Sequence, residues 1–198
     1  VSLHMNDGDR DDFLTDIINT MFNLFTAVDV GIIACMPFVF GLMVNSKYEA
    51  AYYQIPILMI AVLFQVVVGL YSVIYVALKK STEIAKTSFF AAIINIGVDL
   101  LLINYIGLYA ASISTLVAYA AMAIYRYIDV KKYVSVSLSR KNVLAAVFSV
   151  LVSVFAYYTK NMIVCSISLI YVILYAVIFN RVFLCSFMKE LKLKLFKK

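Results

Sequence analysis

The chain has 198 residues, of which 65% are hydrophobic and only 14% are charged, and its formal net charge is +6 at pH 7. Its mean hydropathy of +0.97 excludes a water-soluble globular domain, because too few polar side chains are present to cover the surface. The apolar segments are continuous and of helix length, unlike the short alternating segments of a membrane β-barrel. We therefore expect an all-α, polytopic membrane helical bundle.

The cysteines and the positive charge indicate no soluble-protein function. Cys35, Cys165 and Cys185 belong to apolar segments and show no C-x-x-C spacing, which predicts small apolar side chains and not a disulfide framework or a metal site. The basic residues lie between the apolar segments, so we expect membrane lipid as their partner and no nucleic acid. No cofactor, metal ion or catalytic cluster is expected.

The chain opens with a hydrophilic segment, residues 1–12, which we expect to be a cytoplasmic loop. Because it starts without methionine and in a loop, we also expect a piece of a longer protein. A six-helix membrane domain is expected over residues 13–188. Its first apolar segment, residues 13–44, is too long for one simple crossing, so we expect an interfacial lead-in and a span over about 20–44.

Residues 86–133 form the most informative segment. From Thr87 to Tyr125 there are 39 residues with one charge, Asp99, and at ~1.5 Å per residue they would reach about 58 Å, or two hydrocarbon thicknesses. A break at residues 104–107 is expected, since Gly107 adopts backbone conformations that bulky residues resist. The segment therefore predicts a helical hairpin, with spans over 87–105 and 107–126. Small and polar residues at helical spacing predict the packed faces of this hairpin: Ser88, Ala91, Ala92, Asn95 and Asp99 on its first helix, and Ala111, Thr115, Ala118 and Met122 on its second.

Three further spans complete the expected bundle, over about 52–78, 142–159 and 162–181, with Pro56 in the first turn of the earliest. Residues 189–198, in which Lys and Leu nearly alternate, are expected to form a basic cytoplasmic tail at the membrane surface. With six crossings, 15 of the 17 basic residues lie on one side and only Lys47 and Lys160 on the other. The positive-inside rule therefore predicts that both termini are cytoplasmic.

Polar side chains inside the apolar segments are candidates for a substrate or ion pathway. Asp29 has 12 residues without formal charge before it and 17 after it, and Asp99 interrupts the hairpin. A carboxylate at the bilayer centre costs about 2.5–3.5 kcal/mol, so such a side chain faces protein or water and marks a pathway or a hydrogen-bonded structural contact. Gln65 and Asn95 are weaker candidates. For Asn95, one turn before Asp99, an interhelical hydrogen bond is favoured over a ligand contact.

Three cations near the ends of the expected spans are candidates for a different role. Lys79, Lys80 and Arg126 are interpreted first as anchors at the cytoplasmic membrane surface. Their second interpretation is contact with an anionic head group such as a pyrophosphate.

The run from Ala92 to Thr115, AIINIGVDLLLINYIGLYAASIST, resembles a motif of the bacterial polysaccharide (O-antigen) flippases, in the multidrug, oligosaccharidyl-lipid and polysaccharide exporter superfamily. That family has an Asn-Ile-x-x-Asn helix, a short turn ending in Gly, and then Gly-Ala-Ala. Here Asp99 replaces the second asparagine of the motif, and Tyr109 replaces the glycine of Gly-Ala-Ala. The resemblance covers about residues 14–133.

The resemblance implies a C-terminal part of a transporter with two pseudo-symmetric lobes around a cavity, its missing N-terminal lobe being the natural partner. It implies movement of undecaprenyl-diphosphate-linked oligosaccharide across the bacterial inner membrane for surface polysaccharide biosynthesis. Asp29, Asn95 and Asp99 would line part of the head-group cavity, and the protein would not be an enzyme. The alternatives are a multidrug or cation antiporter of the same superfamily, a membrane-embedded enzyme of polysaccharide biosynthesis, and a complete six-helix accessory subunit.

Overall fold

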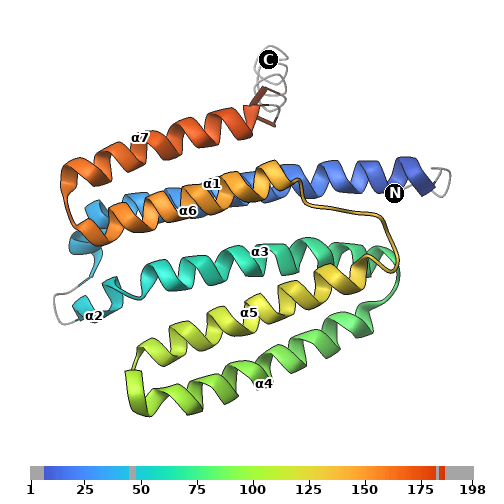
Figure 1. The fold of residues 1–198 in the computed structure, drawn as a ribbon, viewed down its shortest axis with the longest axis horizontal. Helices are drawn as coiled ribbons and strands as arrows, with labels where there is room; N and C mark the ends of the chain where they lie inside the picture. The colour runs from blue at the N-terminus through green and yellow to red at the C-terminus, as the bar shows by residue number, and fades with distance from the viewer. Residues whose placement is uncertain (1–6, 45–47, 182, 186–198) are drawn as a thin grey trace, which may run out of the picture.

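The structure is a computed structural model that describes residues 7–44, 48–181 and 183–185. Figure 1 shows its helices, which are α1 (Asp7–Met43), α2 (Glu49–Tyr52), α3 (Ile55–Ala77), α4 (Ser81–Ile106), α5 (Tyr109–Val130), α6 (Arg140–Thr159) and α7 (Met162–Phe179). No β-strand occurs in the described ranges. All of these helices except the one-turn α2 are long and apolar enough to cross a membrane. The chain is thus an all-α, polytopic membrane helical bundle, as its composition predicts.

Consecutive long helices run in opposite directions, so the connections lie at two ends of the bundle (Figure 1). At one end α1 begins, α3 is followed by α4, and α5 is followed by α6. This end carries Lys79, Lys80, Lys131, Lys132 and Arg140, and we call it the basic end. The α4–α5 turn and Lys160 lie at the opposite end. The described basic residues are therefore separated in space as the six-span interpretation requires.

The first helix is longer than the sequence pattern predicts. Residues 7–12 are not a loop, because α1 starts at Asp7 and continues without interruption to Met43. Acidic residues in the first turns of a helix interact favourably with the positive end of its dipole, which explains the early start. At ~1.5 Å per residue the 37 residues of α1 are about 55 Å long, well beyond the ~30 Å of a hydrocarbon core. α1 is therefore longer than a single crossing of the hydrocarbon core requires.

The helical hairpin is confirmed, with α4 and α5 joined by a turn at Gly107. This glycine has φ +56° and ψ −130°, a conformation that side-chain-bearing residues rarely adopt. The predicted faces meet, since Asn95 Nδ2 donates to Thr115 Oγ1 over 3.3 Å. Ala91 and Met122 belong to one buried cluster. The first helix of the hairpin starts at Ser81, six residues before the expected start of its span.

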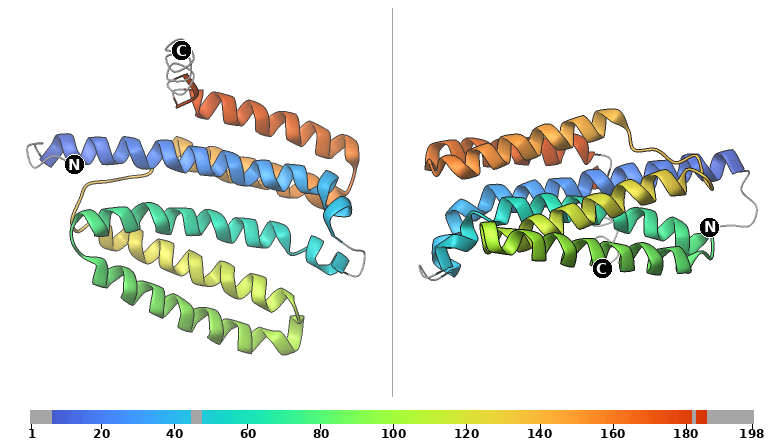
Figure 2. Two further views of the ribbon diagram at one scale, coloured as in Figure 1. Left: turned by 180° about the vertical axis from the view of Figure 1, so that it is seen from behind. Right: turned by 60° about the horizontal axis from the view of Figure 1, so that its bottom comes forward.

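The long helices pack as two groups of three. One group consists of α3, α4 and α5, with α5 against both others, and the second consists of α1, α6 and α7. Contact between α1 and α3 joins the two groups. The two views in Figure 2 show α7 and α4 at opposite edges of the molecule. Pro56 lies in the first turn of α3, as expected.

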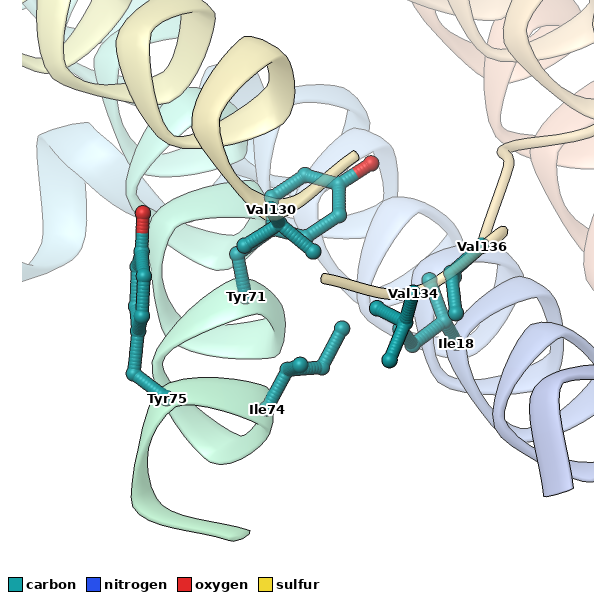
Figure 3. Packing of buried hydrophobic residues seen from close by; sticks show 7 residues of the cluster. All are labelled: Ile18, Tyr71, Ile74, Tyr75, Val130, Val134 and Val136. Carbon is teal, nitrogen blue, oxygen red and sulfur yellow. The ribbon is translucent and has the colours of Figure 1, made fainter. Parts of the chain in front are cut away.

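The linker, residues 131–139, crosses from α5 to α6 over the extended start of α1. Val134 and Val136 of the linker are buried with Ile18 of α1 and with Tyr71 and Ile74 of α3 (Figure 3). The cluster also includes Tyr75 and Val130. Burial of these apolar side chains stabilises the crossing of the linker between the two groups.

Two side chains of α1 fix the linker backbone. Asp11 Oδ2 accepts a hydrogen bond from Ser135 N over 2.7 Å. Asn19 Oδ1 accepts from Ser139 N over 2.7 Å, and Asn19 Nδ2 donates to Ser137 O over 3.0 Å. The start of α1 therefore holds the connection between the two groups. The expected basic tail, residues 189–198, lies outside the described residues.

Candidate functional site

Buried polar side chains are concentrated in the group of α1, α6 and α7. These side chains are Asn23, Thr26 and Asp29 of α1, Ser149 and Ser153 of α6, Ser168 of α7, and Asn180, which directly follows α7. Most of them keep at least one side-chain oxygen without a hydrogen-bond partner in the described part of the chain. Buried polar atoms in proteins are normally paired, so this concentration of unpaired oxygens is unusual. It makes the group the best candidate for a polar site.

Asp29 is the only charged-type side chain in this set. It lies in the middle of α1, is 3% exposed, and neither of its carboxylate oxygens has a partner among the described residues. The next residue, Val30, packs in a cluster with Val150 of α6 and Val172 of α7. An unpaired carboxylate in such a place is unstable, whereas a neutral carboxyl or one with a bound cation is tolerated. The arrangement suits uptake and release of a proton or a small cation.

The hairpin candidates lie apart from Asp29. Asn95 makes the interhelical hydrogen bond that the sequence favours, because its amide donates to Thr115 of α5. Asp99, one turn further along α4, is half-buried, and its Oδ1 is buried without a partner in the described residues. Since α4 belongs to the other three-helix group, the structure does not bring these two residues together with Asp29.

Gln65 does not point into the bundle. It lies on α3 and is exposed, and its side chain forms no hydrogen bond with a described residue. Gly69, four residues further along α3, is exposed as well, so this face of the helix is an outward one. Of the four pathway candidates, Asp29 alone is fully buried among other polar side chains.

Arg126 is buried between the three helices of the other group, near the basic end. It is 1% exposed, and the five N–H groups of its guanidinium make six hydrogen-bond contacts, one N–H being shared between two acceptors. Its acceptors are Val68 O and Ser72 Oγ on α3, with Ile84 O, Thr87 Oγ1 and Ser88 Oγ on α4. All of these acceptors are neutral. Arg126 therefore links three helices, and its donors are already used within the chain.

Lys79 and Lys80 remain at the surface of the basic end. Lys79 has φ +56° and ends α3, while Lys80 N donates to Tyr75 O over 2.8 Å, which closes the helix end. Lys80 Nζ lies 3.5 Å from the centre of the Tyr133 ring of the linker. Lys79 is exposed, so of the three predicted head-group contacts it is the one most open to a ligand.

Tyrosines join the two groups at the opposite end. Tyr52 of α2 stacks on Tyr157 of α6 with ring centres 4.3 Å apart. Each hydroxyl donates to the backbone carbonyl of the other residue, Tyr157 to Tyr52 O over 2.8 Å and Tyr52 to Tyr157 O over 3.3 Å. Lys160 Nζ donates to Tyr53 Oη over 2.6 Å, and this hydrogen bond raises the pKa of Lys160. We call these four residues the tyrosine clasp.

An apolar groove with a volume of about 730 Å³ lies between α6 and the pair α3 and α5. Phe64 and Val67 of α3, Ile124 of α5 and Leu144 of α6 are among its walls, and Phe22 of α1 also lines it. Arg140, the first residue of α6, is the only charged residue among the described lining side chains. The groove begins at the basic end and lies between the linker and the tyrosine clasp.

Comparison with protein-family models, curated proteins and solved structures gave no match. The structure thus defines a class, a multi-pass helical membrane protein with a buried carboxyl group in one of its two helix groups. In the described residues, no three His, Cys, Asp or Glu side chains cluster as a metal site.

Proposed function

We propose that the chain is the C-terminal part of a flippase that moves undecaprenyl-diphosphate-linked oligosaccharide across the bacterial inner membrane for surface polysaccharide biosynthesis. The single observation that carries the proposal is Asp29, a carboxyl in the middle of a long apolar helix that is 3% exposed and has no partner in the described part of the chain. Ionisable residues inside membranes are costly and typically serve transport. The motif from Ala92 to Thr115 supplies the substrate class by resemblance.

The physical role proposed for Asp29 is coupling. Loading its carboxyl with a proton or a cation removes the cost of an unpaired charge in the bundle, and unloading it restores that cost. This difference in free energy can shift the equilibrium between two arrangements of the helices, provided that the carboxyl is exposed to a different extent in each. The hydroxyls of Thr26, three residues before Asp29 on α1, and of Ser153 on α6 are also buried without a hydrogen-bond partner among the described residues.

The proposal is tested with Asp29→Asn in the full-length protein in its native cell. Asparagine has nearly the shape of a protonated aspartate, so the fold is retained while titration and charge pairing are lost. We expect surface glycan to fall with the protein level unchanged. The matched control is Asp16→Asn, on the same helix but exposed, which leaves surface glycan unchanged.

Two results would refute the proposal. Equal loss of glycan and of protein in Asp29→Asn would assign the carboxyl a structural role. Normal glycan together with lost extrusion of cationic drugs would instead favour the antiporter of the same superfamily.

A further inference from the structure

The groove between α6 and α3 with α5 extends over one leaflet of a bilayer. On α6 its lining runs from Arg140 to Leu151, which at ~1.5 Å per residue is about 16 Å, or half of a ~30 Å hydrocarbon core. Its walls are aliphatic and aromatic throughout this length, and its volume is about 730 Å³. These dimensions suit one extended acyl chain that enters from the basic end.

The mouth of the groove is positively charged. Arg140 is exposed and forms no hydrogen bond or ion pair with the described residues. Lys131 reaches the same mouth from the linker, since its Nζ donates to the hydroxyl of Tyr127, a groove residue, over 2.6 Å. The carboxylate of Asp129, the nearest one in sequence, accepts a hydrogen bond from Tyr75 and forms an ion pair with Lys132. A phosphate at this mouth would meet cations without competition from an acidic groove residue in the described part.

We propose that the groove binds an anionic glycerophospholipid of the leaflet at the basic end. One acyl chain lies against Phe64, Val67 and Leu144, and the phosphate lies against Arg140. A polyprenyl chain is several times longer than the groove, so an ordinary membrane phospholipid is the better match. The bound lipid fills the space between α6 and the pair α3 and α5, where the helices of the two groups otherwise touch mainly through α1 and α3. This proposal does not depend on the transport activity proposed above.

The absence of tryptophan from the sequence allows a direct test. A single reporter, Phe64→Trp, is placed in the groove, and the full chain is reconstituted into vesicles of phosphatidylcholine with a minor fraction of phosphatidylglycerol. Bromine, which quenches tryptophan on contact, is carried either by the phosphatidylglycerol or by an equal amount of phosphatidylcholine. We expect stronger quenching by brominated phosphatidylglycerol.

One variant and two further reporters test whether the quenching arises from lipid bound in the groove. Arg140→Gln should reduce the preference for phosphatidylglycerol roughly fivefold, the factor that corresponds to about 1 kcal/mol for one basic residue at an anionic surface. The matched control is Phe155→Trp, also a Phe-to-Trp change but outside the groove and 71% exposed, which should be quenched equally by both lipids. Leu144→Trp, at a groove residue that is 69% exposed, provides a second reporter if Phe64→Trp fails to give a monodisperse protein.

Three results would overturn the proposal. Equal quenching of both groove reporters by the two lipids would show that the groove is unselective lipid-facing surface. An unchanged preference in Arg140→Gln would remove the phosphate contact. Displacement of brominated phosphatidylglycerol by an equimolar amount of undecaprenyl phosphate would identify a polyprenyl chain as the occupant.

Discussion

Replacement of Arg126 tests the packing of α3, α4 and α5, because the conservative change should be the more damaging one. A guanidinium has five N–H donors, so the six contacts of Arg126 count as five hydrogen bonds. Interhelical hydrogen bonds in membrane proteins contribute about 0.6 kcal/mol each, so these five amount to about 3 kcal/mol. Arg126→Lys keeps the buried charge but has at most three donors in place of five, so it loses at least about 1.2 kcal/mol.

Arg126→Met loses all five bonds but also removes a buried charge, whose insertion at a helix centre costs about 2.5–3.5 kcal/mol. On this reckoning the net loss is about 0.5 kcal/mol or less. The hydroxyls left behind are not orphaned, because Ser72 Oγ also donates to Val68 O over 2.7 Å and Thr87 Oγ1 to Glu83 O over 2.8 Å. Methionine also follows the course of the arginine stem, which limits the cavity.

The assay is unfolding of the purified protein in mixed micelles by titration with a denaturing detergent, followed by circular dichroism. We expect the order of stability to be wild type, then Arg126→Met, then Arg126→Lys. A lysine variant more stable than the methionine variant would refute the reasoning, because it would show that the charge itself, and not the geometry of the guanidinium, stabilises the group.

Three further substitutions test other parts of the fold. Gly107→Ala should destabilise the protein by about 1–3 kcal/mol, because alanine resists the backbone conformation at this position, although no atom lies within 4 Å of the added Cβ. The control is Gly97→Ala in the middle of α4, where the added Cβ also has no atom within 4 Å. This substitution should be neutral or stabilising by up to about 1 kcal/mol. Asn19→Ala removes both linker contacts of that side chain and should increase amide hydrogen exchange at residues 134–139 while exchange in α4 stays unchanged. Tyr157→Phe removes one buried hydrogen bond of the tyrosine clasp and should cost about 0.5–1.5 kcal/mol in the same detergent titration.

Each of these tests has a contradicting result. Equal effects of the two glycine substitutions would mean that the turn does not require the observed backbone conformation. Unchanged exchange in the Asn19 variant would mean that the linker is held by its apolar contacts alone. A Tyr157→Phe protein as stable as wild type would mean that stacking, and not the hydrogen bond, joins the groups at the clasp.

Much of the fold follows from the sequence because membrane helices obey length and charge rules. The hairpin is predictable since 39 residues with one charge exceed a single crossing and Gly107 offers the break. The start of α1 is not predictable from apolar periodicity, because Asp7 to Asp12 are polar. Their helical state depends on the helix dipole and on the contact between Asp11 and the linker.

The candidate site is only partly predictable, because spacing along one helix defines a face but not its neighbour. Asp29 is identified by its isolation in an apolar segment, and the structure buries it. Gln65 meets the same criterion yet faces outward. Arg126 is buried because Ser72, Thr87 and Ser88 on the neighbouring helices accept its hydrogen bonds. The sequence does not reveal these partners, because it does not say which helices pack against each other. The groove depends on side chains from four helices and has no local sequence pattern.

The central claim, six crossings with the basic end in the cytoplasm, is tested most directly by cysteine labelling in intact cells. The native Cys35, Cys165 and Cys185 are first replaced by alanine, and single cysteines are then introduced as Lys160→Cys and Lys132→Cys. We expect a membrane-impermeant reagent to label the cysteine at position 160, and the cysteine at position 132 only after the membrane is opened. Labelling of position 132 from outside, or of both positions equally in intact cells, would contradict the account.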